Sequence, residues 1–460
     1  MTPHDSLLTG YNVHTRTDRQ AILQAIGLEE MEDLFSQIPP TVRLQRPLDL
    51  PGPMTEWELS RYFHNLADRN ATTRTHLSFL GGGAYCHYIP ATVDAIASRG
   101  EYLTAYTPYQ PEMSQGLLRV LHDFQHLVSG LLGLPATNCS VYDGTTAMAE
   151  AAWMACVHRK TFAIAASSAI LPQNREVLET YLGGRNVSIQ WVPDDALTGE
   201  TDLDALREVL TSRPAAFLVQ TPNRFGVLEP IRRITALCRE HEVLSSVAVY
   251  PMILGCLQSP GSQGADLVTA EAQPLGLPLN AGGPYLGLIA CQPDLEPLLP
   301  GRIVGECSDL KGEPALALVK EEREQHVSRD KATSHICSNQ SLLALRASVY
   351  LATLGARGFA HVSALCVEKA HALADTLTSL PEVRLAKSGR FFNEFLLDLP
   401  KPAASVLASL HTQGIFGGLD FSAHAPDSGR PHQLLVAVTE LHTRADLERM
   451  ASAFHHALTS

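Results

Sequence analysis

The stretch from Asp266 to Ala290, "DLVTAEAQPLGLPLNAGGPYLGLIA", indicates the fold class of this chain. Two apolar runs, at 266–272 and 285–291, have the length and composition of buried β-strands. The loop between them contains a Gly-Gly-Pro turn and is too short for a helical crossover, which parallel strands require. We therefore expect these two strands to be antiparallel.

Five further apolar runs precede this stretch, and helical or loop segments separate most of them. They lie at 138–143, 161–167, 186–192, 215–221 and 244–250. Near-continuous apolar strands that alternate with helices are typical of a mostly parallel sheet with helices on both faces. The sequence therefore predicts a large α/β domain with a seven-stranded, mostly parallel sheet.

The segments around this sheet predict three parts in the chain. Residues 1–75 form an N-terminal helical arm, with short amphipathic helices at 17–28 and 29–39, and residues 76–325 form the large α/β domain, which includes a core helix at 112–134. Residues 326–460 form a connecting helix and a small α+β domain. In that part Asn339 and Thr443 are expected helix caps, and Gly355 is an expected helix end.

Composition and charge exclude several classes of protein. The 460-residue chain has a formal net charge of −13 and is 45% hydrophobic. Gripping a nucleic-acid backbone needs a basic surface, so we expect no nucleic-acid partner. The N-terminus lacks the pattern of a signal peptide and no long uncharged apolar run occurs, so we expect a cytoplasmic protein without a membrane partner. The nine cysteines are scattered and form no CxxC pair, which argues against a disulfide scaffold or a zinc site.

The run "VYDGTTAMAEAA" places Gly144, Thr145 and Thr146 where a strand turns into a helix. Free backbone N–H groups and the helix dipole make such a helix start a natural binding site for a phosphate. Because every helix start has free amides, an ordinary capped helix explains the same residues. The phosphate role stays one of two readings.

The loop "TAYTPYQPEMSQG" gathers polar and aromatic groups between two prolines and a glycine. These groups are Tyr106, Tyr109, Gln110, Ser114 and Gln115. Prolines restrict such a loop to few conformations, which suits groups that must meet a small substrate. A stiff surface turn is the alternative reading.

The segment "SFLGGGAYCHYIP" combines three glycines with Tyr85, Cys86 and His87. Adjacent residues of an extended chain point to opposite sides, so Cys86 and His87 are not expected to form a nucleophilic pair. His122 and His126 share a helix face at the spacing of metal ligands, but no third ligand is suggested nearby. We therefore predict no metal site.

The distribution of lysines limits the chemistry of the sheet domain. The chain has seven lysines, and none lies between Lys160 and Lys311. In a large class of pyridoxal-phosphate enzymes the cofactor lysine lies on a loop after a strand of the α/β domain, and Gln273 lies on such a loop here. Schiff-base chemistry requires a lysine amine. The chain is therefore not expected to bind this cofactor covalently in that place.

Many motifs along the chain together resemble one family. In order they include "LFSQIP", "RPLDLP", "SFLGGGAYCHYIP", "YTPYQPEMSQG", "VYDGTTAMAEAA", "PNRFGVLE", "LGLPLNAGGPYLG", "PGRIVGE", "REQHVSRDKATSHICSNQ", "FFNEF" and "VTELHTRADL". They span roughly residues 18 to 450. The chain thus resembles the α subunits (subunit 1) of the two-subunit bacterial P-protein of the glycine cleavage system, glycine dehydrogenase (decarboxylating).

The resemblance implies an aspartate-aminotransferase-like fold, pyridoxal-phosphate fold type I, in an α₂β₂ assembly. The pyridoxal phosphate and its lysine are then expected on the β subunit, with the active site near the α/β interface. The implied activity is an oxidoreductase reaction in which glycine loses CO₂ and its aminomethyl group passes to the lipoyl disulfide of H-protein. The cofactor would supply the electron chemistry.

The resemblance also implies roles for candidate site residues. The loop with Tyr106, Tyr109, Gln110, Ser114 and Gln115 is expected nearest the shared site, and Gly81–Gly83 with Tyr85 and His87 is expected beside it. The chain departs from the family pattern at four positions, which are Cys86 in place of Asp, Leu171 in place of His, Tyr250 in place of Asp and Ala272 in place of Gly. The missing Asp and His would be cofactor partners. Their loss favours a vestigial phosphate cup at Gly144, Thr145 and Thr146, with no catalytic residue in this chain alone.

Two other functions remain open from the sequence. The chain could be an autonomous pyridoxal-phosphate enzyme that uses Lys331 or Lys160. Lys331 lies in a charged run in which a solvated lysine is the usual case. The chain could also be a non-catalytic scaffold that has lost its partner, and the four departures favour this reading.

Overall fold

The computed structural model describes residues 14–44, 46, 48–105, 108–280, 283, 285–334, 340–425 and 429–460. The chain divides into two compact units, one that ends at Ala71 and one from Thr72 to Ser460. The predicted boundaries at 75/76 and 325/326 stay a prediction. In the described residues, no helix combines the length and the apolar character needed to cross a bilayer.

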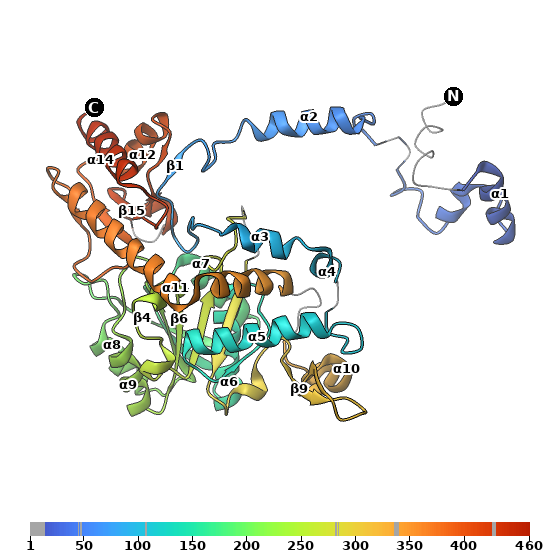
Figure 1. Ribbon diagram of the computed structural model, residues 1–460, viewed down its shortest axis with the longest axis horizontal. Helices are drawn as coiled ribbons and strands as arrows, with labels where there is room; N and C mark the ends of the chain where they lie inside the picture. The colour runs from blue at the N-terminus through green and yellow to red at the C-terminus, as the bar shows by residue number, and fades with distance from the viewer. Residues whose placement is uncertain are drawn as a thin grey trace. The chain divides into compact units, whose positions relative to one another are not determined.

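The first unit contains α1 (Arg16–Ala25), a 3₁₀ helix (Met31–Phe35) and α2 (Glu56–Ala67) (Figure 1). Thr15 and Thr55 each begin a helix with a capping box, in which hydroxyl and backbone groups satisfy each other's free hydrogen-bonding positions. The helix predicted at 29–39 is wrong in type and length. A single 3₁₀ segment forms instead, and the Pro-Pro pair at 39–40 prevents a helix from continuing beyond it.

The second unit contains the predicted seven-stranded sheet, in the order β2-β8-β7-β6-β5-β3-β4. Its strands are β2 (Ala136–Thr137), β3 (Ala163–Ser167), β4 (Ser188–Val192), β5 (Ala216–Thr221), β6 (Leu244–Val249), β7 (Leu267–Glu271) and β8 (Gly287–Cys291). The strands from β4 to β7 are parallel, whereas β8 is antiparallel to β7 and to β2. The mostly parallel sheet and the antiparallel β7–β8 pair are both confirmed.

The first predicted strand, at 138–143, is wrong. Only Val141 of this run pairs, in an isolated bridge to Gly287, and the regular strand β2 lies just before it. The side chain of Asn138 donates to the carbonyl of Pro300, and the backbone N–H of Cys139 donates to the carbonyl of Arg302. These bonds draw the backbone away from the sheet, which an apolar pattern alone cannot indicate.

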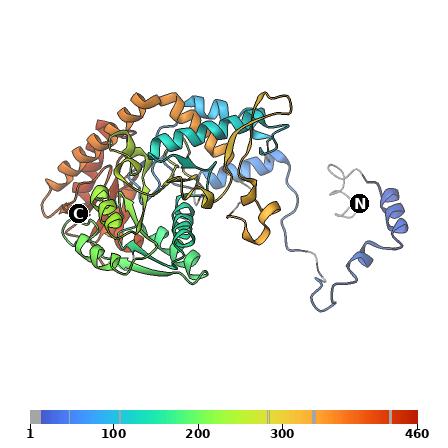
Figure 2. The ribbon, with the colours of Figure 1, turned by 90° about the horizontal axis from the view of Figure 1, so that it is seen from below.

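Helices cover both faces of this sheet, as Figures 1 and 2 show. Alternate strand residues, such as Phe217 and Val219, pack in one core with α5 (Gln115–Leu132), α8 (Leu203–Leu210), α9 (Ile231–Glu240) and α11 (Ser341–Thr378). The intervening residues, such as Leu218, pack in a second core with α6 (Gly144–Arg159) and α7 (Pro172–Gly183). The period of two along each strand thus separates the two cores.

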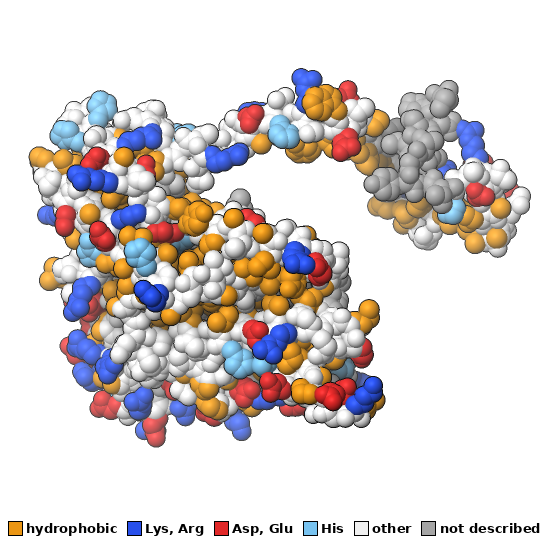
Figure 3. All heavy atoms as spheres, viewed as in Figure 1, with side chains coloured by type: hydrophobic (Ala, Val, Ile, Leu, Met, Phe, Trp, Pro, Cys, Tyr) orange, Lys and Arg blue, Asp and Glu red, His pale blue; other side chains and the backbone are white. Residues whose placement is uncertain are grey.

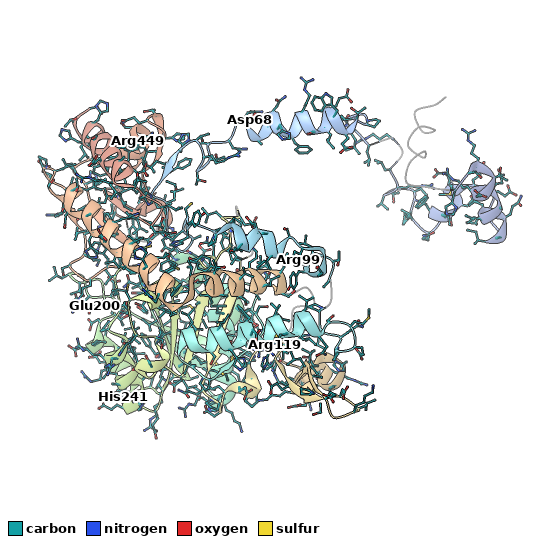
Figure 4. The ribbon with its side chains drawn as sticks, viewed as in Figure 1. Asp68, Arg99, Arg119, Glu200, His241 and Arg449 are labelled. Atoms are coloured by element: carbon teal, nitrogen blue, oxygen red, sulfur yellow. The ribbon has the colours of Figure 1, made fainter. Side chains whose placement is uncertain are left out.

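Helix α5 is the core helix that the sequence predicts. Leu121, Phe124 and Val128 are buried on its inner face. On its outer face Arg119 pairs with Asp123 at 2.9 Å and stays exposed (Figure 4). Gly133, in the left-handed conformation, ends the helix.

The smaller sheet has the order β11-β12-β15-β14 and its own core. Its strands are β11 (Arg384–Leu385), β12 (Glu394–Asp398), β14 (Leu419–Asp420) and β15 (Gln433–Ala437), and its helices are α12 (Ala403–Thr412), α13 (Phe421–His424) and α14 (Arg444–Thr459). The predicted cap Thr443 is confirmed, since it forms a capping box with Asp446. The predicted cap Asn339 lies outside the described residues.

Helix α11 links the two cores and is broken at Gly355. This glycine has φ 60° and ψ 179°, which no helical residue adopts. The first helical segment of α11 thus ends at Gly355, as predicted, and a second segment follows directly after the kink. Glycine is suited to this position because residues with a Cβ rarely adopt a positive φ.

The glycine-rich segment is anchored to the smaller sheet by a buried glutamate. Before it, β1 (Leu77–Ser78) pairs in parallel with β13 (Ile415–Phe416). Glu394 on β12 then accepts a hydrogen bond of 2.7 Å from the N–H of Gly82 and one of 3.0 Å from the hydroxyl of Tyr85. Burial raises the pKa of Glu394 to about 7.

Replacing Glu394 by Gln tests this contact through the pH dependence of stability. In the unfolded chain the carboxyl loses its proton near its ordinary pKa of 4.5, while in the folded chain it keeps the proton up to about pH 7. The contribution of Glu394 to the free energy of unfolding is thus fully present below pH 4.5 and falls as pH rises to 7. Between pH 5 and pH 8, Glu394→Gln should gain up to about 3 kcal/mol relative to the native chain.

Urea unfolding of both proteins at the two pH values measures this difference. Glu176→Gln, on the exposed side of α7, is the matched control and should show no such gain. A Glu394→Gln difference that is the same at both pH values would contradict the buried, protonated carboxyl.

Candidate functional site

A cavity of about 270 Å³ opens at the carboxyl ends of the parallel strands of the large sheet, where ligands of open α/β sheets bind. It lies between the glycine-rich segment, the start of α6 and the ends of β5, β6 and β7. The residues that decide its chemistry are Gly81, Gly82, Gly83, Tyr85, Asp143, Gly144, Thr145, Leu171, Gln173, Asn174, Gln220, Tyr250, Glu271 and Tyr285. Among the described lining residues, none is a lysine, an arginine or a histidine.

The start of α6 at this cavity is bound by the protein's own carboxylates. Asp143 accepts a hydrogen bond of 2.7 Å from the N–H of Thr146. Glu271, at the end of β7, accepts one of 2.9 Å from the N–H of Gly144. Its other oxygen accepts from the N–H groups of Gln273 and Leu286. Burial raises the pKa of Glu271 to about 7.

The carboxyl of Glu271 therefore already binds the first N–H group of α6, which a phosphate at this helix start would have to displace. A Cβ at position 144 would lie only 2.7 Å from the Cβ of Glu271, so the two backbones approach each other closely and leave no room for a side chain at Gly144. Gly144 and Thr145 line this cavity, whereas Thr146 lines a second one.

Gln273 lies on the loop after β7, where the sequence draws attention to a missing lysine. Its buried amide accepts from the N–H of Tyr85 at 3.0 Å and donates to the carbonyl of Tyr85 at 2.9 Å. It also donates to the carbonyl of Leu277. Gln273 thus fastens the glycine-rich segment to the loop 272–280, and the loop has a structural role in this chain.

Tyr250 follows β6 and lies against the same cavity. Its hydroxyl is 2.5 Å from Nε2 of His87, and its ring centre lies 4.7 Å from that of Tyr85. Nδ1 of His87 is 2.7 Å from the carboxylate of Glu440, which follows β15. His87 therefore faces Tyr250 and Glu440.

These residues do not fit pyridoxal phosphate. No lysine lines the cavity, the first amide of α6 already binds Glu271, and a tyrosine follows β6 where an acid would pair with a pyridine nitrogen. Leu171, which lines the cavity at the start of α7, offers an aliphatic surface in place of an aromatic one.

Of the loop predicted as the nearest to a shared site, Tyr109 lines a second cavity, of about 160 Å³. Tyr109 is buried there, and burial raises its pKa. The guanidinium of Arg302 lies 4.4 Å from the centre of the Tyr109 ring, and its Nε is 3.8 Å from the carboxylate of Glu324. The ring of Tyr109 thus lies between the guanidinium of Arg302 and the protein core.

The other residues of this loop have separate surroundings. Gln115 forms two hydrogen bonds of 2.9 Å with the backbone N–H and carbonyl of Leu316 on β10 (Pro314–Leu318). Strand β10 pairs with β9 (Val304–Ser308), and this hairpin has no counterpart in the predicted elements. Ser114 precedes α5 without a side-chain cap, and Gln110 is exposed. Tyr106 lies outside the described residues.

The structure brings only some of the predicted site residues together, at two separate cavities. Tyr85, Gly144 and Thr145 lie at the first cavity, with His87 behind Tyr250, whereas Tyr109 and Thr146 lie at the second. Sequence reasoning missed Glu271, Arg302 and Glu440. An acidic residue at the end of an apolar strand was the available signal for Glu271. Arg302 and Glu440 carry no local signal, because their partners are far away in the sequence.

Comparisons with known proteins place the chain in a family. A family model described as "Glycine cleavage system P-protein" matches residues 10–454. A Moorella thermoacetica protein named "Probable glycine dehydrogenase (decarboxylating) subunit 1" is 44% identical over 439 residues, which cover 95% of this chain and 97% of that protein.

Solved structures agree with this match. A crystal structure of glycine decarboxylase (P-protein) of the glycine cleavage system, in inhibitor-bound form, is 36% identical with a TM-score of 0.88, and the match covers 98% of this chain and 100% of that chain. A sphingosine-1-phosphate lyase from Burkholderia pseudomallei, at 15% identity, has a TM-score of 0.66 and covers 92% and 94% of the two chains, which shows a shared fold. The fold is that of pyridoxal-phosphate enzymes of fold type I, and the chain belongs to the family of glycine cleavage system P-proteins.

Proposed function

We propose that this chain is subunit 1 of a two-subunit glycine decarboxylase, the P-protein of the glycine cleavage system. With its β subunit it would decarboxylate glycine, release CO₂ and pass the aminomethyl group to the lipoyl group of H-protein, as an oxidoreductase with a disulfide acceptor. The observation that carries this proposal is the nearly full-length similarity to proteins named subunit 1 of glycine dehydrogenase.

The second part of the proposal is that pyridoxal phosphate binds to the β subunit. It is supported by the lysine-free span between Lys160 and Lys311. It is also supported by the hydrogen bond between Glu271 and the first amide of α6, which a phosphate would have to displace. This chain would then contribute binding and positioning groups to a site that lies at the subunit interface.

A partner subunit, in an α₂β₂ assembly, is consistent with the exposed surface of the chain. Figure 3 shows hydrophobic side chains gathered over α3 (Ala91–Ala97) and α11. Exposed large apolar side chains of these two helices include Ile96 on α3 and Leu342 on α11. Contiguous apolar patches on soluble proteins usually mark contacts with other molecules.

Within this proposal, Tyr109 would present its edge to the shared site. Its ring lies under Arg302, and the backbone bonds of Gln115 keep the start of α5 fixed against β10. Tyr106, Gln110 and Ser114 would complete the loop, and Tyr85 and His87 would support the neighbouring glycine-rich segment.

The autonomous pyridoxal-phosphate enzyme has less support. Lys160 ends α6 in the left-handed conformation, at the end of the helix opposite to the first cavity. Lys331 lies in an exposed 3₁₀ turn (Arg329–Lys331). Neither lines the first cavity. If the chain is a non-catalytic scaffold, it still assembles with the β subunit, but the complex has no activity.

Reconstitution tests the proposed division of labour. The isolated chain, mixed with pyridoxal phosphate and passed through a desalting column, should show no visible absorbance from lysine-bound cofactor. The complex with the matching β subunit should show that absorbance and should exchange the carboxyl of glycine with labelled CO₂ when lipoylated H-protein is added. Absorbance in the isolated chain would favour the autonomous enzyme, and a coloured but inactive complex would favour the scaffold.

Tyr109→Ala tests the role of the loop. Removing the ring leaves Arg302 without its aromatic partner, and we expect glycine–CO₂ exchange of the complex to fall at least about ten-fold, which corresponds to about 1.4 kcal/mol. Assembly with the β subunit, measured by size-exclusion chromatography with light scattering, should persist.

The matched control for this variant is Phe162→Ala, which removes an exposed ring before β3, and it should leave exchange unchanged. Tyr109→Phe keeps the ring under Arg302 and separates the role of the hydroxyl from that of stacking. Full exchange activity in an assembled Tyr109→Ala complex would exclude the loop from the site.

A further inference from the structure

Three side chains of different chemistry meet in the interior, next to Tyr250. They are His87 from the segment after the three glycines, Cys366 from α11 and Glu440 from the residue run after β15. One ligand atom from each, Nδ1 of the histidine, Sγ of the cysteine and a carboxylate oxygen, lies within 4.8 Å of the other two. Among the described residues, no other group of three possible ligands comes this close. We propose that these three residues bind one Zn²⁺ ion.

The distances are close to those of a zinc site. Nδ1 of His87 is 2.7 Å from Oε2 of Glu440, and Sγ of Cys366 is 3.5 Å from the same oxygen. With Zn–N and Zn–O of about 2.1 Å and Zn–S of about 2.3 Å, a tetrahedral site separates neighbouring ligand atoms by about 3.4–3.6 Å. The Cys366–Glu440 distance already has this value, and the His87–Glu440 distance must open by less than about 1 Å.

Hydrogen bonds to the other polar atoms of His87 and Glu440 orient Nδ1 and Oε2 toward the centre of the cluster. Nε2 of His87 lies 2.5 Å from the hydroxyl of Tyr250, which can accept the ring proton and so leave Nδ1 free to bind a metal. Oε1 of Glu440 accepts from the N–H of Tyr88 at 2.7 Å, which leaves Oε2 toward the other ligands. Metal-binding histidines and carboxylates in proteins usually have such outer partners.

The charge of the ligand set favours a divalent cation. When Zn²⁺ binds, the thiol of Cys366 releases one proton to solvent and binds as a thiolate, the imidazole of His87 stays neutral with its proton moved to Nε2, and Glu440 binds as a carboxylate. The two negative ligands neutralise the two positive charges of the ion. A neutral complex costs less to bury than an isolated ion. The mixed sulfur, nitrogen and oxygen set is one that zinc accepts.

The ligands are buried but can be reached from one side. The side chains of His87 and Glu440 are 2% and 9% exposed, and Cys366 is fully buried. A groove of about 470 Å³ is lined by Tyr85, Cys86 and His87, so an ion can approach from this groove. Water from the groove would supply the fourth ligand.

One positive group lies close to the cluster. Nζ of Lys369, one turn after Cys366 on α11, donates to the backbone carbonyl of Glu440 at 2.5 Å. Because this amine binds the backbone carbonyl, it does not compete with a metal ion for the carboxylate of Glu440. A cluster held by hydrogen bonds alone, in which Nδ1–H of His87 and the thiol of Cys366 both donate to Oε2 of Glu440, is the competing interpretation of the same contacts.

Metal content of the isolated full chain decides between the two readings. The chain is stripped with a chelator, dialysed against ZnCl₂ and then against metal-free buffer, and bound zinc is counted by mass spectrometry. We expect about one Zn²⁺ per native chain. Cys366→Ser and Glu440→Gln should retain less than about one tenth of this amount, whereas Cys238→Ala, which removes a fully buried thiol of α9, should retain all of it.

Cobalt gives a second readout that does not depend on the variants. The native chain loaded with Co²⁺ should show the thiolate-to-cobalt absorbance in the near ultraviolet together with visible bands of tetrahedral cobalt. No stoichiometric zinc, equal zinc in all variants, or cobalt without the thiolate absorbance would overturn the proposal. If a variant fails to fold by circular dichroism, the cobalt spectrum of the native chain decides. The test needs no β subunit, so its outcome is independent of the proposed activity.

Discussion

The buried carboxyl of Glu271 at the start of α6 limits what the first cavity, at the carboxyl ends of the large-sheet strands, can hold. In this fold a helix start beside the ends of parallel strands is the natural place for a phosphate, because its N–H groups have no partner in the helix. Here the first of these groups binds Glu271, and the same carboxyl binds two N–H groups of the following loop and strand. A phosphate at the start of α6 would lie next to the carboxyl of Glu271 and would lack the N–H of Gly144 as a donor.

The surrounding residues are consistent with that constraint. Once the phosphate position is closed, a lysine on the loop after β7 has no cofactor to bind, and Gln273 uses the position to fasten the glycine-rich segment. The hydroxyl of Tyr250 likewise contacts His87, which in turn contacts the carboxylate of Glu440. Several polar groups of the cavity wall thus bind other groups of this chain, among them Gln173 with the carbonyl of Gly82 and Asn174 with Gln220.

Much of the fold could be predicted from the sequence because it depends on patterns within single segments. The apolar runs predict six of the seven large-sheet strands, and the short loop before Tyr285 predicts the antiparallel pair. The site could be predicted only in part. Contacts such as Arg302 with Tyr109, or Glu440 with His87, join residues far apart in the chain, and nothing in either segment indicates the other. The run at 138–143 failed for the same reason, since its partners are Pro300 and Arg302.

The two hydrogen bonds between Gln115 and Leu316 have a consequence for how this chain can vary. Both bonds end on the backbone of β10, so the side chain at position 316 is not part of the contact. The hairpin β9–β10 can therefore exchange most of its side chains without releasing the start of α5. Substitution at Gln115 itself has no such freedom, because its side-chain amide both donates to the carbonyl and accepts from the N–H of Leu316. The conformation of the Tyr109 loop thus depends on Gln115, and side-chain substitutions in the hairpin have little effect on it.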